Sequence, residues 1–363
     1  MSVSRRGKSW QVRWVNASGK RCSRTFARKA DAEEYERTQK SMARRFEVHD
    51  PSKSRVTVRE LYPRWIATKT NRKPKTVQGY ESTWRNVVEP RWGDSQLRSI
   101  TMAEVKVWAA NCSSTTGKTL GATKAREAYF VLCMILDFAI EDGLIVKNPA
   151  RPSTGTTKSF LPTVPDGTDR NYLDEDELEA VAEEAGHYRD LIILLGTLGL
   201  RFGEACGLKG GDVDLKANII HVRRTLSDVR GQIIEQPPKN GISREVPLPE
   251  YLRERLRQRK LRAGEEGYIF TTPDGSVIRH SNFSRRVWKP VLQRVGIKKY
   301  VRIHDLRGTA ASWLISRGAS VIDVSKMLGH KDPSITLKRY ARLVDEASKR
   351  LRKSMDREGR RFA

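Results

Sequence analysis

A stretch of residues near the middle of the chain constrains the fold more than any other feature. The segment RPSTGTTKSFLPTVPDGTDR (Arg151–Arg170) is rich in proline, glycine, serine and threonine. This composition disfavours helices and central strands and is typical of a linker, which can run extended around a ligand. A chain of 363 residues is also long enough for two or three domains. We therefore expect separately folded parts joined by a linker at residues 151–170.

The charge of the chain indicates a polyanionic partner. Its 69 Lys and Arg residues exceed its 43 Asp and Glu residues, which gives a formal net charge of +26. So much charge of one sign repels itself unless an anion neutralises it, and nucleic acid is the usual polyanion. A membrane surface is the alternative, but neither end of the chain carries a lipidation signal. The longest apolar run, Leu191–Leu200, is also too short to cross a bilayer.

Cysteine usage and the missing cofactor motifs narrow the chemistry. The four cysteines form no CxxC pair, which disfavours a zinc site; they are Cys22, Cys112, Cys133 and Cys206. Their scatter is typical of free thiols in a reducing cytoplasm, and no apolar export segment follows Arg5-Arg6. The sequence has no phosphate-binding loop motif and no paired carboxylates at metal-site spacing. We expect no metal ion and no other cofactor.

The first 55 residues predict a small basic domain with a β-sheet and a helix. Segments Ser9–Val15 and Arg21–Ala27 alternate with period two around the turn-forming residues 16–19. A further short strand is expected near Ser2–Arg6, and a helix over residues 29–46. This part holds 15 Lys and Arg against 6 Asp and Glu, and a β-ribbon can enter the major groove of DNA. Its candidate DNA contacts are Arg13, Arg21 and Arg24, although a solvated sheet face is the alternative.

The next part of the chain, up to residue 150, predicts four short helices. Capping boxes at Thr57–Glu60 and Thr101–Glu104 have the spacing that begins a helix. Apolar side chains at helical spacing mark a second helix around residues 77–87 and a fourth around residues 128–139. Interleaved lysines make this bundle basic, and its candidate DNA contacts are Lys73, Lys75 and Lys124.

From Tyr172 onward the chain predicts a larger domain of mixed structure. An acidic helix is expected over Asp174–Gly186, and a buried helix over Asp190–Leu200, where the apolar run is nearly continuous. Helices are also expected from about residue 250 to the C-terminus. Three strands are expected between these helical parts, over Asn218–Leu226, Gly231–Gln236 and Arg244–Pro249.

Two polar clusters in this domain are candidates for chemistry. In GLRFGE, Arg201 follows the apolar run, where an unpaired guanidinium would be costly, so it needs Glu204 or an anion as its partner. A purely structural ion pair explains this pattern equally well. In PPKNGISREVPLP, Asn240-Gly241 is a strong hairpin signal that would place Lys239 at a strand-turn tip able to reach into a groove. Alone, this second cluster favours an ordinary exposed lysine.

Two further clusters lie nearer the C-terminus. In HDLRGTAASWL, His304 and Arg307 are three residues apart at the start of a helix, so they share a face where anions are attracted. In LGHKDPSITLKRY, a helix is expected to end at Gly329, with His330 just beyond it. Pro333 would break the chain before a short helix that carries Tyr340. A single tyrosine is usually half-buried packing, so the weight of this residue depends on the other clusters.

The order and context of these clusters resemble those of the tyrosine recombinases, the phage integrase family. The matching segments are TLGLRFGEACGL, PPKNGISREVPLP, HDLRGTAAS and LGHKDPSITLKRYARL, and the resemblance covers residues from about 170 to 350. Each segment alone is a weak signal, but four in one order are specific. One difference is that many relatives carry an aromatic residue where this chain has Lys209-Gly210-Gly211.

The resemblance implies a multidomain, mainly α-helical fold with small β-sheets. Residues 1–55 would be an arm-type DNA-binding domain with a small sheet and a helix, and residues 56–150 a four-helix, SAM-like core-binding domain. After the linker, residues 171–363 would form a mixed α+β tyrosine-recombinase catalytic domain. The tail after Tyr340 would pack on a neighbouring subunit, with folding back onto its own subunit as an equal alternative.

The resemblance also implies a site-specific DNA recombinase, the integrase of a temperate phage, which integrates and excises phage DNA through a 3′-phosphotyrosyl intermediate. The implied catalytic residues are Arg201, Lys239, His304, Arg307, His330 and the nucleophile Tyr340, supported by Glu204. The implied partners are core-type and arm-type attachment sites in double-stranded DNA, a homotetramer, a host DNA-bending protein and an excision factor. The protein would act in the cytoplasm of the bacterial host, without a membrane or a cofactor.

Alternative functions remain open. A Xer-like resolvase or a type IB topoisomerase-like enzyme would use the same chemistry, and the separate basic N-terminal part argues for an integrase instead. A non-catalytic DNA-binding protein is the alternative from another class. The complete set of Arg, Lys, His, Arg, His and Tyr argues against it.

Overall fold

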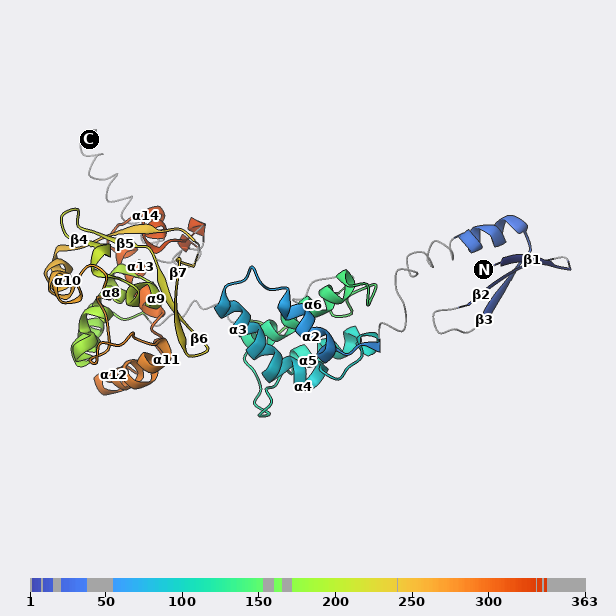
Figure 1. Cartoon of the computed structure of the whole chain (residues 1–363), viewed down its shortest axis with the longest axis horizontal. Helices are drawn as coiled ribbons and strands as arrows, with labels where there is room; N and C mark the ends of the chain where they lie inside the picture. The colour runs from blue at the N-terminus through green and yellow to red at the C-terminus, as the bar shows by residue number, and fades with distance from the viewer. Residues whose placement is uncertain are drawn as a thin grey trace, which may run out of the picture. The chain divides into compact units, whose positions relative to one another are not determined.

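In the computed structural model of this protein, the described residues are 2–7, 9–15, 21–37, 55–152, 160–164, 172–239, 241–330, 332–334, 336 and 337. The chain divides into two compact units, residues 1–165 and residues 166–363. Figure 1 labels the helices and strands of the chain. The described part is mainly helical and contains three small β-sheets, so the predicted fold class is confirmed. None of its helices has the length and apolar character of a membrane span.

A three-stranded antiparallel sheet opens the chain. Its strands are β1 (Ser2–Arg6), β2 (Ser9–Val15) and β3 (Arg21–Phe26), with β2 in the middle. Residues 29–37 are helical, and Val12 and Ala32 are fully buried. The predicted strands are confirmed. The predicted turn at residues 16–19 and the predicted helix beyond residue 37 lie outside the described residues.

Four helical segments occupy the fully described range 55–152. They are α2 (Val58–Ala67), α3 (Pro74–Thr83) continuing through η2 (Trp84–Val88) into α4 (Glu89–Trp92), α5 (Met102–Ala110) and α6 (Ala122–Glu141), with a short turn η3 (Leu97–Ser99). Both predicted capping boxes are present, at the start of α2 and of α5. Trp65, Trp92 and Tyr129 are the largest fully buried side chains of this core. Leu161, inside the segment predicted as a linker, is buried in the same core, so this part of the segment packs on the helices.

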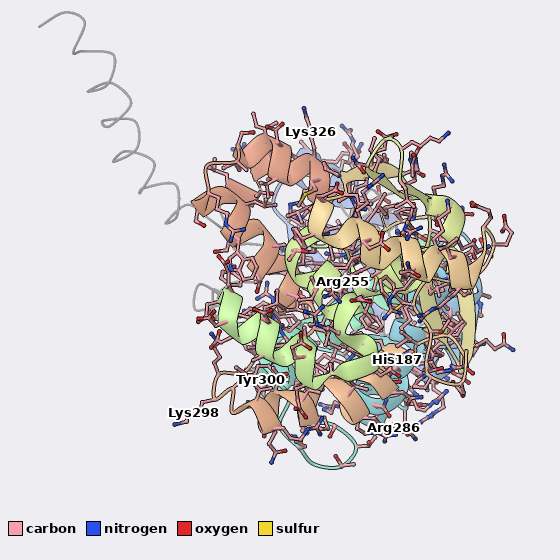
Figure 2. The ribbon with its side chains drawn as sticks, turned by 90° about the vertical axis from the view of Figure 1, so that its left-hand side faces the viewer. His187, Arg255, Arg286, Lys298, Tyr300 and Lys326 are labelled. Atoms are coloured by element: carbon pink, nitrogen blue, oxygen red, sulfur yellow. The ribbon has the colours of Figure 1, made fainter. Side chains whose placement is uncertain are left out.

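Helices also form most of the second unit. They are α7 (Glu175–Glu184), α8 (Arg189–Leu198), α9 (Phe202–Cys206), α10 (Glu250–Ala263), α11 (His280–Phe283) continuing through η7 (Ser284–Trp288) into α12 (Lys289–Val295), α13 (Asp305–Ser316) and α14 (Val321–Leu328). The short turns η5 (Gly186–Tyr188) and η6 (Gly210–Asp212) complete it. Helix α8 packs against α7 and α13, and α7 and α8 confirm the predicted acidic and buried helices. Lys298 and Lys326 point outward from this unit (Figure 2).

Two helices widen into a π turn just before a proline. The turn η2 precedes Pro90, and η7 precedes Pro290. Proline has no N–H, and its ring crowds the carbonyl four residues earlier. At the first site that carbonyl belongs to Asn86, and it accepts the N–H of Thr115 instead (3.1 Å). The wider turn therefore lets each helix continue past its proline.

The strands of the second unit form two separate sheets. One contains β4 (Val213–Asp214), β5 (Ile219–Val222) and β8 (Arg244–Pro247), and the other contains β6 (Thr225–Val229) and β7 (Gln232–Gln236). The single strand predicted over residues 218–226 is therefore wrong. The chain leaves the first sheet at Arg223-Arg224 and enters the second.

The hairpin predicted at Asn240-Gly241 is also wrong. Among the described strands, β7 pairs with β6 and β8 pairs with β5, so β7 and β8 lie in different sheets. The two-residue hairpin loop is instead Arg230-Gly231, between the paired residues Val229 and Gln232, with φ values of 51° and 82°. Positive φ at both loop residues is what a type I′ turn requires. Asn240 itself lies outside the described residues.

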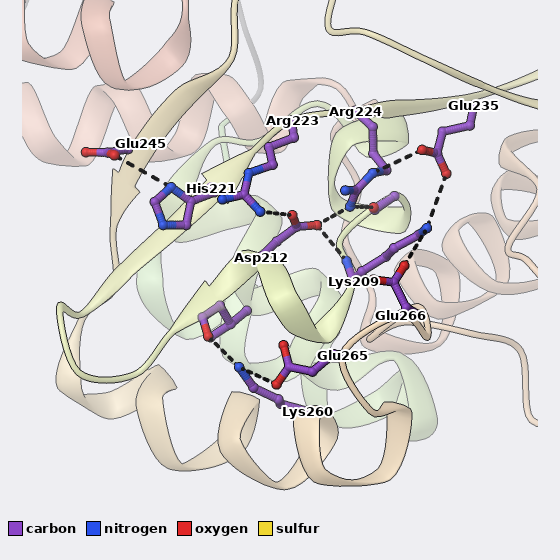
Figure 3. Close-up of polar contacts among 12 residues, drawn as sticks. Lys209, Asp212, His221, Arg223, Arg224, Glu235, Glu245, Lys260, Glu265 and Glu266 are labelled. Atoms are coloured by element: carbon purple, nitrogen blue, oxygen red, sulfur yellow. Dashed lines mark hydrogen bonds and ion pairs between the residues drawn. The ribbon is translucent and has the colours of Figure 1, made fainter.

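A buried carboxylate explains the break between β5 and β6. Asp212 is 1% exposed and accepts hydrogen bonds from the backbone N–H of Lys209 (2.9 Å) and from the guanidinium of Arg224. Arg224 also pairs with Glu235 of β7 (3.2 Å), and Arg223 lies 3.4 Å from Asp212 (Figure 3). The two arginines at the break therefore tie the hairpin to the turn before β4.

The segment Lys209-Gly210-Gly211, where the chain differs from the family pattern, packs closely against another part of the backbone. A Cβ on Gly210 would lie 2.0 Å from the carbonyl oxygen of Gly264. The N–H of Gly211 donates to the carbonyl of Glu265 (2.8 Å). Gly210 therefore has no room for any side chain, because the chain after α10 occupies that space.

Candidate active site

The turn after α8 places Arg201 beside a buried carboxylate. Gly199, a left-handed residue (φ 64°), caps the end of α8, and Arg201 then precedes α9 with an extended backbone. Its Nη1 donates to Oε1 of Glu204 (2.7 Å), and its backbone N–H donates to Oε2 (2.9 Å). The side chain of Glu204 is 0% exposed, whereas that of Arg201 is 21% exposed. Arg201 is thus paired with a carboxylate and still reaches solvent.

Arg244 of β8 is a second partner of Glu204. Its Nη2 donates to Oε2 (2.7 Å) and its Nη1 to Oε1 (3.1 Å), a fork that fits a carboxylate. Burial would raise the pKa of Glu204, but the hydrogen bond and charge of Arg244, and the charge and backbone N–H of Arg201, lower it to about 2. Sequence reasoning missed Arg244. The alternation of the predicted strand could have indicated it, because Arg244 lies two positions before the buried Val246 and so points to the same, inner face.

Arg307 of α13 is buried and bound to two backbone carbonyls. It is 3% exposed, its Nη1 donates to the carbonyl of Gly199 (2.8 Å), and its Nη2 donates to the carbonyl of Leu328. His304, three residues earlier, is exposed and lies just before the helix. His304 and Tyr300 both line a cavity of about 590 Å³. The two predicted site residues therefore differ in burial: Arg307 is buried, whereas His304 is exposed.

Three consecutive carbonyls at the end of α14 each accept a hydrogen bond from a different arginine. The carbonyl of Met327 accepts from Nε of Arg244 (2.7 Å), and the carbonyl of Leu328 accepts from Nη2 of Arg307. The carbonyl of Gly329 accepts from Nη2 of Arg201 (3.4 Å). The last carbonyls of a helix have no partner within the helix and carry the negative end of its dipole. Guanidinium groups are suitable partners for them, so the end of α14 gives each arginine a defined direction.

His330 follows this helix end directly. Gly329 caps α14 in the left-handed conformation (φ 70°), as predicted, and the N–H of His330 donates to the carbonyl of Ser325 (3.1 Å). The ring Nδ1 lies 2.7 Å from the hydroxyl of the buried Thr336. The hydroxyl of Thr336 therefore helps to orient the imidazole next to the carbonyl that Arg201 contacts.

The segment after His330 is described only in part. Residues 333, 334, 336 and 337 are helical, so Pro333 stands at the start of a helical stretch, where proline is tolerated. The carboxylate of Asp332 accepts the N–H of Ser334 (2.8 Å). Tyr340 and the tail predicted to pack on a neighbour lie outside the described residues.

Lys239 lies in an exposed turn between β7 and β8. The N–H of Gly241 donates to the carbonyl of Pro238 (2.8 Å), which closes the turn. The same connection leads into Arg244 five residues later. The structure thus brings Arg201, Glu204, Arg307 and His330 to the end of α14, and it leaves Lys239 and His304 on exposed segments.

The candidate DNA contacts of the N-terminal sheet occupy different faces. Arg13 is paired with Ser23, and Arg24 with Val12. Neighbouring strand positions point to opposite faces, and paired residues point to the same one. Arg24 therefore shares the face of the buried Val12, with its guanidinium 5.2 Å from the ring centre of Tyr35, whereas Arg13 lies on the other face. The side chain of Arg21 is outside the described part.

The candidate lysines of the middle helices lie at helix starts. Lys73 and Lys75 are exposed at the start of α3, and Lys75 donates to Gln78 (3.0 Å). Lys124, in the first turn of α6, donates to the hydroxyl of Thr83 (2.7 Å) at the far end of α3. The three lysines therefore do not gather at one end of α3.

The described part of the chain contains no group of three or more His, Cys, Asp or Glu side chains that could hold a metal ion. Its three free cysteines, Cys112, Cys133 and Cys206, are buried. Burial raises the pKa of Cys112 and of Cys133 to about 11, so both stay protonated thiols at neutral pH. All three side chains belong to the buried cores of the two units.

Comparison with known proteins identifies relatives across most of the chain. Residues 171–347 match the phage integrase family. The XerC-like tyrosine recombinase of Caldanaerobacter subterraneus is 32% identical over 325 residues, which cover 80% of each chain. The integrase of Mycobacterium phage D29 is 29% identical over 331 residues, covering 87% of this chain and 84% of that protein.

Two solved structures share the fold. The Tn1549 transposon integrase in complex with transposon right end DNA has a TM-score of 0.69 at 21% identity, covering 82% of this chain and 99% of that one. The lambda integrase dimer bound to a COC′ core site has a TM-score of 0.58 at 18% identity, covering 93% of each chain. The likeness extends over both compact units.

Proposed function

Because this chain belongs to the phage integrase family of tyrosine recombinases, we propose that it cuts and rejoins DNA at attachment sites through a covalent bond to Tyr340. The observation that carries this proposal is the set of arginines at the end of α14. Arg201 and Arg307 are 106 positions apart in the chain (307 − 201), yet they donate to adjacent carbonyls. The segment that follows these carbonyls leads to Tyr340.

The charge of this cluster suits a phosphodiester. Arg201 and Arg244 both bind the carboxylate of Glu204, and both also donate to a neutral backbone carbonyl at the end of α14. Arg307 donates to two neutral carbonyls, one of which is the neighbouring Leu328. Within this set of four side chains, the excess is two positive charges. A phosphodiester carries one negative charge, and attack on its phosphorus builds up a second on the non-bridging oxygens. The cluster therefore matches the transition state better than the ground state, which is the condition for catalysis.

In the proposed mechanism, Arg201 and Arg307 bind the non-bridging oxygens, because the guanidinium fork matches phosphate geometry. The Tyr340 oxygen attacks phosphorus, and the bond from phosphorus to the 5′-oxygen breaks. A 3′-phosphotyrosyl bond forms and a 5′-hydroxyl is released. A 5′-hydroxyl from the partner strand then attacks the same phosphorus and expels Tyr340.

Proton transfers accompany both steps. The leaving 5′-oxygen is strongly basic, so Lys239 gives it a proton. His304 and His330 hydrogen-bond the phosphate or accept the proton of Tyr340. In the second step the transfers run in reverse: the attacking 5′-hydroxyl gives its proton to Lys239, and the expelled Tyr340 oxygen regains a proton. The bond energy stays in the phosphotyrosine, so rejoining needs neither ATP nor another cofactor.

The proposed biological role is integration and excision of phage DNA in the bacterial cytoplasm. Residues 1–55 would bind arm-type sites, residues 56–150 core-type sites, and residues 171–363 would catalyse exchange, with residues 151–170 as the connection. Exchange would occur in a homotetramer, as in the lambda integrase tetramer bound to a Holliday junction. A host DNA-bending protein and an excision factor would help arm and core sites meet.

Resolution of chromosome dimers is a second candidate function. It is favoured by the 32% identity to a XerC-like recombinase. The strand-rich N-terminal part favours an integrase, because simple resolvases of this kind usually lack such a part. Recombination of two unlike attachment sites would support integration, whereas exchange restricted to identical sites would support resolution.

The proposed nucleophile is tested with nicked suicide duplexes that tile the DNA flanking the gene. We expect the wild-type full-length chain to form a covalent complex on a denaturing gel, and Tyr340→Phe to bind the same duplex without forming it. Tyr251→Phe is the matched control, because Tyr251 is an exposed tyrosine (58%) of the same unit. A band that persists in Tyr340→Phe would assign the nucleophile to another residue. Binding without any wild-type band would favour a non-catalytic DNA-binding protein.

A further inference from the structure

Arg244 connects the two sides of the arginine cluster. It comes from β8, its side chain is 9% exposed, and it donates to Glu204 on one side and to the carbonyl of Met327 on the other. Arg201 is also bonded to Glu204, but its hydrogen bond to the end of α14, at the carbonyl of Gly329, is longer (3.4 Å). Arg244 makes a hydrogen bond of 2.7 Å in each direction. It is not among the six residues to which the proposed mechanism gives a chemical role.

We propose that Arg244 is a positioning residue of the recombination reaction. It holds Glu204 and the end of α14 at a fixed separation, which sets the direction of the Arg201 guanidinium and the place of His330. This inference rests on the proposed function, and it adds a residue that touches neither the phosphate nor the tyrosine.

The Glu204 carboxylate is saturated with donors, and Arg244 supplies half of them. Oε1 accepts from Nη1 of Arg201 (2.7 Å) and Nη1 of Arg244 (3.1 Å). Oε2 accepts from Nη2 of Arg244 (2.7 Å) and the backbone N–H of Arg201 (2.9 Å). With four donors on two oxygens, the carboxylate cannot rotate. Without Arg244, each oxygen would lose one partner in a site that water does not reach, and the carboxylate would turn toward Arg201.

Arg244 also contacts the end of α14. Its Nε donates to the carbonyl of Met327 (2.7 Å). A Cβ on Gly329 would lie 3.0 Å from Cδ and 3.2 Å from Nε of Arg244, so the glycine lets the backbone rest against this side chain. His330 follows at the next position. The side chain of Arg244 therefore sets how close the segment leading to Tyr340 comes to the cluster.

Only a guanidinium can make these contacts together. Arg244 uses both terminal nitrogens on one carboxylate and its Nε on a carbonyl in another direction. A lysine ammonium is a single point donor and cannot span both partners. Arg244→Lys therefore keeps the charge and removes the bridge.

The test compares Arg244→Lys with Arg259→Lys in the full-length chain, on the suicide duplex that traps the wild-type complex. Arg259 of α10 is a matched control: it also bonds a carboxylate, Asp190 (2.6 Å), and a backbone carbonyl, that of His187 (3.1 Å). We expect Arg244→Lys to form the covalent complex about 100-fold more slowly at saturating protein. Its dissociation constant for the duplex should stay within about threefold of wild type, since a positioning residue affects the chemical step. Arg259→Lys should cut at the wild-type rate.

A double-substitution cycle separates positioning from general damage. If Arg244 acts through Glu204, then Arg244→Lys, Glu204→Gln and the double variant should all cut at similar low rates, because the pair acts as a unit. Rate losses that multiply in the double variant would overturn the proposal. Equal rates for Arg244→Lys and Arg259→Lys would overturn it as well.

A second pair of variants keeps the result decisive if Arg244→Lys fails to fold. Gly329→Ala places a methyl group against the side chain of Arg244 and leaves Arg244 itself in place. Gly296→Ala is the control. Gly296 has a similar φ of 80°, and no atom lies within 4 Å of the place that a Cβ would take there. Slower cutting by Gly329→Ala alone would support the proposal, and equal rates would overturn it. Absence of any wild-type covalent complex would instead refute the proposed function.

Discussion

Two buried carboxylates of the second unit, Glu204 and Asp212, are each bound by two arginines, yet their surroundings differ in charge. Glu204 is the single carboxylate in a set with three guanidinium groups, which also donate to backbone carbonyls at the ends of α8 and α14. Around Asp212, three cations face three carboxylates (Figure 3). The cations are Lys209, Arg223 and Arg224, and the carboxylates are Asp212, Glu235 and Glu266.

The difference teaches how to tell a binding cluster from a structural one. An arginine that donates only to neutral carbonyls keeps its full charge for a ligand, and two arginines that share one carboxylate keep one positive charge between them. A cluster with as many carboxylates as cations keeps none. The cluster at Glu204 is left with two positive charges in excess, and the cluster at Asp212 is balanced. Burial of a carboxylate between arginines is common to both, so it does not by itself indicate function.

The largest expected effect contrasts Arg307→Lys with Arg224→Lys. Each variant keeps the charge and loses the guanidinium fork. We expect Arg307→Lys to slow covalent complex formation about 10³-fold, because a donor to the developing phosphate charge is lost. Arg224→Lys should stay within about threefold of wild type, since Arg224 joins the hairpin to η6. Single-turnover rates at saturating protein measure both effects. Equal losses of rate in the two variants would contradict the assignment of one cluster to catalysis and the other to structure.

The next effect is the dependence of stability on acid. The pKa of Glu204 is lowered to about 2 from 4.5, so its stabilisation is complete above pH 4.5 and is lost as the pH falls from 4.5 toward 2. A shift of this size corresponds to about 3 kcal/mol of unfolding free energy. We expect wild type to lose about 3 kcal/mol more than Glu204→Gln between pH 5 and pH 2. Urea unfolding at a series of pH values measures this, and parallel curves for the two proteins would contradict it.

The smallest expected effect is that of Glu235→Gln in the balanced cluster. The side chain of Glu235 is 44% exposed and contacts Arg224, Lys209 and the hydroxyl of Tyr268. A partly exposed ion pair contributes little, so we expect a loss of at most about 1 kcal/mol of unfolding free energy. The rate of covalent complex formation should not change. A large loss of rate with intact folding would mean that the balanced cluster also serves the reaction.

Much of the molecule could be predicted from sequence because the signals are local. The family, predicted from four segments in one order, is confirmed, and so are the fold class and the function as a DNA recombinase. The capping boxes at Thr57 and Thr101 and the helix end at Gly329 lie where residue spacing predicted them. The roles of the candidate catalytic residues stay predictions, with Tyr340 outside the described part.

The errors arose where partners are distant in sequence. Asn240-Gly241 has the local composition of a hairpin, but β7 was already paired with β6 through Arg230-Gly231. The break at Arg223-Arg224 depends on Asp212, which the chain has passed eleven and twelve positions earlier. A strand pattern shows which residues are extended and which face they share, and it does not show which strand lies beside them.

The sequence by itself determined the charge of the protein, its helices and their caps, and the order of the arginine, lysine, histidine and tyrosine segments. The charge and the order of the segments are read directly from the chain. The helices and caps depend on residues within three or four positions of one another, whose geometry the helix itself sets. Only the tertiary structure decided which acceptors each arginine has. Glu204 and Arg244 are 40 positions apart, and Arg201 and Gly329 are 128 apart. Such pairs form only when β8, α9 and the end of α14 pack together, because each guanidinium takes whichever buried acceptors the packing leaves without a partner.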